Sequence, residues 1–190
     1  MKLLYLTESN LRDRLFIQDL VHNFKYELSE DVLLVHAPFG GTVRDTRFVT
    51  KRISTLLSET LVYNNAFTIE QRDLVKVSEE GMQVNVEMIP KLVAPINLLI
   101  LGPVAKGPDG PVIIDSIELV EALRSQLSIE ETIVFPANGL SPLGRKNTVI
   151  TDQEQVLELK KAYDEESEAL ELAYRLRPAK LASPVTYSNS

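Results

Sequence analysis

One stretch decides how this sequence folds, and it reads Val32-Leu33-Leu34-Val35-His36-Ala37-Pro38-Phe39-Gly40-Gly41-Thr42. Its first half is an uninterrupted apolar run, which is typical of a strand buried on both faces of a sheet. Two adjacent glycines follow, and Thr42 stands three residues before Asp45, which is the order of a helix capping box. The stretch therefore predicts a buried strand, a glycine turn and a helix that begins near Val43.

The same alternation of strands and helices continues on both sides of this stretch. Further short apolar runs predict strands at Leu3–Leu6, Ile96–Leu101, Val112–Ile114 and Thr132–Phe135. Apolar residues at helical spacing predict helices between them, including one over Ser116–Leu127. Parallel strands need crossover connections, which are usually helices. The sequence therefore predicts an α/β fold, a three-layer αβα sandwich around a mostly parallel sheet.

Two helical segments downstream have signals at their ends. Thr68 stands three residues before Gln71, again in capping-box order, which predicts a helix beginning near Ile69. A long helical stretch from Gln153 to about Leu176 contains the acidic run Asp164-Glu165-Glu166, so we expect either one helix or two. The acidic run itself is interpreted as a solvated face.

The segment from Gly81 to Leu101 has a mixed pattern. Val84, Ile89 and Val93 suit a helix, but Pro90 would interrupt the interior of one. We therefore expect a kinked or two-part helix there, before the strand that ends at Leu101.

Composition bounds the class of protein. With 190 residues, 44% of them hydrophobic and 25% charged, we expect one domain over residues 1–182 and a flexible polar tail over 183–190. The formal net charge of −7 disfavours nucleic acids and anionic membranes as partners. The absence of cysteine excludes disulfides, thiol nucleophiles and thiolate zinc sites. We expect a cytoplasmic protein, because no apolar run suits a signal peptide or a bilayer span.

The glycine turn has two interpretations. Glycines let backbone N–H groups approach an anion, and the following helix start adds unpaired donors and the positive end of a dipole. Alternatively, the turn is a tight connection without a ligand. The two histidines, His22 and His36, are expected to be structural, and no cluster at metal-ligand spacing accompanies them, so no metal site is expected.

Several motifs occur in a fixed order along the chain. They are Val35-His36-Ala37-Pro38-Phe39-Gly40-Gly41, Gly81-Met82-Gln83-Val84-Asn85, Leu98–Gly102, Lys106–Gly110, Ile133–Gly139, Gly144, Asn147, Asp152, Ala169–Ala173 and Ala179–Leu181. In this order they resemble acetylglutamate kinase, of the amino-acid kinase superfamily, over roughly residues 1–182. The resemblance implies an amino-acid-kinase-like fold.

The resemblance also implies roles for individual residues. It implies that the glycine backbone holds a substrate carboxylate, that the hairpin Lys106–Gly110 covers the substrate, and that Asp152 orients catalytic lysines. The substrate-binding residues that it implies are Gly40, Gly41, Thr42, Asn138, Gly139 and Asn147. Asn147 and Asp152 stand one residue further apart than in the family.

The departures from the family affect catalysis, because phosphoryl transfer depends on positioning and on cations that neutralise charge. Tyr5 stands near the position of the first-strand lysine, and Thr7-Glu8 replaces paired glycines. Ala66 precedes Thr68 where an arginine would bind the substrate carboxylate. The nucleotide-binding half would lie beyond Ser190. We therefore expect no cofactor, and ATP only with a partner.

These observations leave several functions open. The leading hypothesis is a shortened, catalytically degenerate acetylglutamate-kinase-like protein that binds a small carboxylate or acyl-amino acid. One alternative is a regulatory or structural subunit, working as a homo-oligomer or with a partner kinase. Another is an active kinase completed by a separate ATP-binding subunit. A universal-stress-type ATP-binding protein is a lesser competitor, because its glycine pattern is absent after Gly107 and Gly110.

Overall fold

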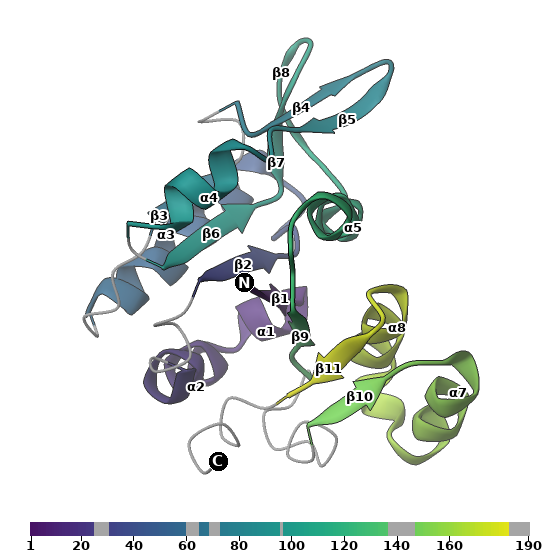
Figure 1. Ribbon diagram of the computed structural model, residues 1–190. Helices are drawn as coiled ribbons and strands as arrows, with labels where there is room; N and C mark the ends of the chain where they lie inside the picture. Colours follow the sequence, from purple (N-terminus) through teal and green to yellow (C-terminus); the bar gives the residue numbers. More distant parts are fainter. Residues whose placement is uncertain (25–30, 60–64, 69–72, 96, 137–146, 183–190) are drawn as a thin grey trace.

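The structure is a computed structural model that describes residues 1–24, 31–59, 65–68, 73–95, 97–136 and 147–182. A seven-stranded sheet with the order β10-β11-β9-β1-β2-β6-β3 forms its centre (Figure 1). Its strands are β1 (Lys2–Leu6), β2 (Val32–His36), β3 (Asn65–Thr68), β6 (Leu98–Gly102), β9 (Glu131–Val134), β10 (Thr148–Ile150) and β11 (Ala179–Leu181). Neighbouring strands are parallel except at β10, which is antiparallel to β11.

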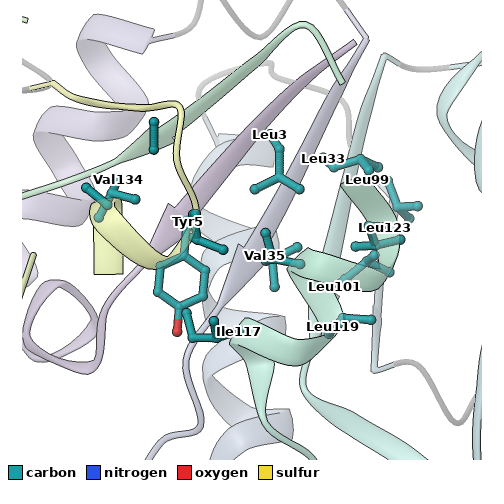
Figure 2. Packing of buried hydrophobic residues seen from close by; sticks show 14 of the residues in the cluster. Leu3, Tyr5, Leu33, Val35, Leu99, Leu101, Ile117, Leu119, Leu123 and Val134 are labelled. Carbon is teal, nitrogen blue, oxygen red and sulfur yellow. The ribbon is translucent and has the colours of Figure 1, made fainter. Parts of the chain in front are cut away.

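Helices cover both faces of this sheet, which confirms the predicted α/β sandwich. Leu4 and Leu34 pack with α1 (Glu8–Arg12), α2 (Arg14–Phe24) and α3 (Val43–Glu59). Leu3, Tyr5 and Val35 point to the other face, where they pack with α4 (Met88–Val93), α5 (Ser116–Gln126), α7 (Gln153–Ala162) and α8 (Ser167–Arg175) (Figure 2). Successive strand residues therefore feed two separate cores.

A second, four-stranded sheet with the order β5-β4-β7-β8 adjoins the carboxyl end of β6. Its strands are β4 (Val75–Ser78), β5 (Gly81–Val84), β7 (Val104–Gly107) and β8 (Gly110–Ile113). The prediction that Val112–Ile114 is a strand buried on both faces was wrong. Residues 112–113 belong to β8 at the edge of this smaller sheet and are only partly buried, because β8 pairs with β7 alone.

The prediction of a helix within Gly81–Leu101 was also wrong for the first part of that segment. Gly81 has φ +112° and closes a hairpin in which β5 pairs antiparallel with β4. Met82 and Val84 are half-buried while Gln83 is exposed, which is the alternation of a strand rather than a helix. Only Met88–Val93 is helical, and Pro90 fits its first turn, where the missing N–H has no intrahelical partner to lose.

Other helix boundaries agree with the sequence in part. Helix α3 begins at Val43, as predicted. The long helical stretch divides into α7, a 3-10 turn over Asp164–Glu166 and α8, so two helices form. Asp164 and Glu165 are exposed, but Glu166 is buried, which corrects the expectation of a fully solvated acidic run.

The helix predicted near Ile69 falls on residues 69–72, which lie outside the described residues, as does the tail 183–190. The flanking residues are strands, since β3 ends at Thr68 and β4 begins at Val75. Within the described part of the chain, every helix is too short or too polar to cross a membrane.

Candidate functional site

The glycine turn lies at the carboxyl end of β2 and leads directly into α3. Gly40 has φ +62° and Gly41 has φ +70°, a conformation that costs other L residues about 1–2 kcal/mol. A Cβ on Gly40 would come within 3.0 Å of the Asp45 carboxylate, whereas a Cβ on Gly41 would meet nothing within 4 Å. Both glycines are exposed, so the space beside Gly41 opens to solvent.

The turn presents backbone donors. Among the described residues, no hydrogen bond is donated by the backbone N–H of Gly40, Gly41, Val43 or Arg44. The Thr42 side chain caps α3, because its Oγ1 accepts from the Asp45 N–H at 3.0 Å and donates to Asp45 Oδ2 at 2.8 Å. The unused N–H groups coincide with the positive end of a 17-residue helix, an arrangement that suits an anion.

A buried polar network fixes the shape of this turn from below. Thr46 is fully buried, and its hydroxyl accepts from the Phe39 N–H at 3.1 Å while lying 3.3 Å from the Phe39 carbonyl oxygen. His36 Nδ1 lies 2.7 Å from the Ala37 carbonyl oxygen. Because a carbonyl oxygen only accepts, Nδ1 carries a proton. The residues between β2 and the glycines are therefore held by side chains from β2 and α3.

His36 is structural, as the sequence analysis predicted. Its ring is fully buried between the end of β2 and α3, and its Nε2 lies 2.8 Å from Thr50 Oγ1. Burial lowers the pKa of His36 from 6.5 to about 4, and the hydrogen bond to Ala37 opposes this shift. The imidazole is consequently neutral at neutral pH. The side chain of His22 lies outside the described residues.

Arg12 is a cation near the turn that the sequence analysis missed. Its guanidinium carbon lies 5.2 Å from the centre of the Phe39 ring, directly before the glycines. An ion pair 2.5 Å long joins Arg12 to Glu8 one helical turn earlier, so much of its charge is already balanced. Only the packing of α1 beside the turn brings Arg12 there, and no local motif signals it.

The residues at the end of β1 have structural roles. Thr7 is the N-cap of α1, and its hydroxyl and backbone N–H both bond to Asn10. The Asn10 side chain also donates to the Pro136 carbonyl oxygen at 2.9 Å, which ties β1 to the end of β9. Thr7-Glu8, which stands where the family has glycines, thus forms a helix start in this chain.

Tyr5 points to the other face of the sheet. Its side chain is buried among apolar residues (Figure 2). Its hydroxyl lies 2.8 Å from the Ser116 hydroxyl at the start of α5. Burial raises the pKa of Tyr5 to about 12, and the Ser116 hydrogen bond opposes this shift. Tyr5 is therefore a neutral core residue and supplies no positive charge.

Of the remaining site residues predicted from the sequence, the structure describes Asn147 and Asp152, and neither lies at the turn. Asn138 and Gly139 lie outside the described residues. Asn147 precedes β10, which is four strand positions from β2 in the sheet, or roughly 19 Å at the usual strand spacing. Its φ is +49°, and its buried Oδ1 has no hydrogen-bond partner among the described residues.

Asp152 lies next to the edge strand β10, at the opposite end of the strands from the glycine turn. It follows β10, whose antiparallel pairing with β11 places Ile150 beside Ala179, the first residue of β11. Its carboxylate is the N-cap of α7 and accepts from the Gln155 N–H at 2.9 Å, and this bond is the main cause that lowers the pKa of Asp152. The structure therefore does not bring Asp152 to the turn.

No group of three or more potential metal ligands occurs among the described residues. The groups that the structure does bring together are the exposed glycine amides, the start of α3 and Arg12. This arrangement can bind an anion through backbone donors, with one partly neutralised cation nearby.

Comparison with solved structures places the chain among proteins with an amino-acid-kinase-like fold. N-acetylglutamate synthase from Neisseria gonorrhoeae, complexed with coenzyme A and L-arginine, matches 97% of the chain at a TM-score of 0.63 and 9% identity. Isopentenyl phosphate kinase matches 98% of the chain at a TM-score of 0.58 and 11% identity. Aspartate kinase from Synechocystis matches 97% at 0.54 and 13% identity.

These likenesses establish the fold alone, because every identity is low. The chain spans 56% of the synthase, 93% of isopentenyl phosphate kinase and 40% of the aspartate kinase. No protein-family model and no curated protein sequence matches the chain.

Proposed function

We propose that this chain is a catalytically degenerate amino-acid-kinase-like protein that binds a small carboxylate or acyl-amino acid at the turn Gly40-Gly41-Thr42. One observation carries the proposal. Two adjacent, exposed glycines with positive φ stand at the start of α3, and their N–H groups have no acceptor among the described residues. A carboxylate seated there gains charge-assisted hydrogen bonds and the favourable end of the helix dipole.

The same surroundings argue against phosphotransfer. A transferred phosphoryl group needs cations beside it. Tyr5 is neutral and buried on the other face, and the charge of Arg12 is balanced by Glu8. Glu8 also adds negative charge near the turn, which disfavours a triphosphate more strongly than a single carboxylate. We therefore propose binding without catalysis and without ATP as a cofactor.

The second candidate is a regulatory or structural subunit, acting as a homo-oligomer or with a partner kinase. The observation that favours it is Phe48 on α3, a large aromatic side chain that is 65% exposed. This role is compatible with ligand binding, since a bound carboxylate at the start of α3 lies on the same helix.

Calorimetry with acetylglutamate, glutamate and aspartate tests the proposal. The wild-type protein is expected to bind at least one of them, and Gly41→Val is expected to weaken binding because its side chain blocks approach to the backbone. Gly81→Val is the matched control. Gly81 also has positive φ and nothing within 4 Å of a Cβ, but it lies in the β4–β5 hairpin.

Three results would contradict the proposal. An absence of heat with all three ligands at millimolar concentration would remove the binding site, and equal weakening by Gly81→Val would show that backbone strain, not the turn, is responsible. Phosphorylation of any of these ligands from ATP by the purified chain alone would refute the proposed loss of catalysis. Phosphorylation only after addition of a separate ATP-binding protein would support a completed kinase instead.

A further inference from the structure

The outward face of α3 concentrates positive charge around one exposed aromatic ring. Phe48 is 65% exposed. Arg44 precedes it by one helical turn, and Lys51 and Arg52 follow it by one turn, so all three lie on its side of the helix. Arg47 is adjacent and also exposed. We call these five residues the α3 face.

The charge of the α3 face opposes that of the whole chain. The formal net charge is −7, yet this face holds four cations within nine residues. Asp45 is the one acidic residue in that interval, and it is engaged by the Thr42 cap. An exposed aromatic residue ringed by cations suits an apolar residue flanked by carboxylates.

Helix α7 presents that pattern. Leu157 is 54% exposed, with Glu154 one turn before it and Glu158 next to it, both exposed. Lys161 follows one turn later and limits the acidic character to the amino-terminal part of the helix. We call Glu154, Leu157, Glu158 and Lys161 the α7 face.

The two faces cannot meet within one molecule. Helix α3 packs on the side of the sheet that holds Leu34, through Val49 and Ile53, whereas α7 packs on the other side through Val156. Figure 1 shows the two helices at opposite ends of the seven-stranded sheet, with α3 beside β6 and β3 and α7 beside β10. Contact between these faces therefore needs two copies of the chain.

We propose that copies of this chain associate head to tail, the α3 face of one copy docking on the α7 face of the next. Charge complementarity selects this pairing. Two α3 faces would place like charges together, and the overall negative charge opposes a nucleic acid on the α3 face. Two helix faces form a small contact, so the association is weak and sensitive to salt. A head-to-tail contact extends into a chain of subunits unless it closes into a ring.

Sedimentation velocity on the full chain tests this pairing at low and high salt. The wild-type mass is expected to rise with protein concentration at low salt and to fall toward the monomer when salt is added. Phe48→Glu breaks the α3 face, and Leu157→Lys breaks the α7 face. Both positions are largely exposed, so the variants are expected to keep the fold, which circular dichroism checks.

A mixture of the two variants gives the sharpest outcome. Each variant alone is expected to stay monomeric. An equal mixture is expected to form a pair that cannot extend further, because the intact α3 face of Leu157→Lys meets the intact α7 face of Phe48→Glu. Lys51→Glu is expected to weaken wild-type association. Lys91→Glu, the same change at an exposed position on α4, is the matched control and is expected to leave it unchanged.

Several results would overturn the proposal. These are a wild-type chain that stays monomeric at every concentration, single variants that associate as the wild type does, or a mixture that stays monomeric. Binding of a fluorescent oligonucleotide that Phe48→Glu abolishes, without wild-type self-association, would assign the α3 face to nucleic acid instead. Because none of these measurements uses a carboxylate ligand, their failure is separable from failure of the proposed function.

Discussion

His36 and Thr50 are joined by a hydrogen bond in which the imidazole Nε2 lies 2.8 Å from the threonine hydroxyl oxygen. Thr50 Oγ1 also lies 3.0 Å from the Thr46 carbonyl oxygen, so His36 and Thr46 both offer an acceptor to its single hydroxyl proton. The three residues link β2 to α3 immediately below the glycine turn, so the shape of the turn depends on a buried network as well as on its glycines.

Thr50→Val is expected to destabilise the protein by about 1–3 kcal/mol, because it leaves the buried His36 Nε2 without its partner. Thr50→Ser keeps the hydroxyl and is the matched control, with a smaller loss. Chemical denaturation measures both. Equal stability of Thr50→Val and the wild type would show that the network contributes nothing.

Stability is expected to fall as pH decreases from about 6.5 to about 4. The pKa of His36 is lowered to about 4 in the folded protein, so the unfolded chain binds a proton that the folded chain refuses in this window. The full difference amounts to about 3 kcal/mol. Denaturation at pH 7 and pH 5 captures about 2 kcal/mol of this difference. It is measured as the difference between the wild type and His36→Asn, which corrects for the carboxylates. A pH slope that is the same in His36→Asn would contradict this assignment.

The pair Tyr5 and Ser116 is expected to lose stability at high pH. The pKa of Tyr5 is raised to about 12, so the stabilising neutral form is fully present below pH 10 and is lost as pH rises toward 12. Tyr5→Phe is expected to cost about 1 kcal/mol at neutral pH because Ser116 loses its partner. A double variant with Ser116→Ala should lose less than the two single variants combined. Additive losses would mean that the hydroxyls do not interact.

Replacing each glycine of the turn by alanine separates the cost of backbone strain from the cost of a steric contact. Gly41→Ala is expected to cost about 1 kcal/mol from positive φ alone. Gly40→Ala is expected to cost more, because its Cβ also comes within 3.0 Å of the Asp45 carboxylate at the start of α3. Thermal denaturation compares them. The opposite order would mean that the Asp45 side chain moves away without loss.

Asp152→Ala is expected to lower the denaturation midpoint, since it removes the N-cap of α7. Asp152→Asn retains an acceptor and is expected to restore most of the stability. Neither change should affect binding of a carboxylate, because Asp152 lies at the edge strand β10 and at the opposite end of the strands from the glycine turn. Loss of binding in Asp152→Asn at full stability would instead give Asp152 a role in the site.

Local sequence signals predicted the sheet and several helices well. Uniform apolar runs such as Leu33–Val35 mark strands buried on both faces, and the Thr42 cap marks the start of α3. The signals failed at Gly81–Val84, where a few alternating residues suit a helix or a strand equally. The pairing of β5 with β4 decides between them, and that contact is not local.

The site shows the same division between local and tertiary information. The sequence by itself determined that Gly40 and Gly41 form a turn between a buried strand and a capped helix, because glycine and capping preferences act over a few residues. Only the tertiary structure decided which groups surround that turn. It brought Arg12 beside Phe39, turned Tyr5 to Ser116 on the other face and left Asp152 at the far edge, because strand order and helix packing join residues that are distant in the chain.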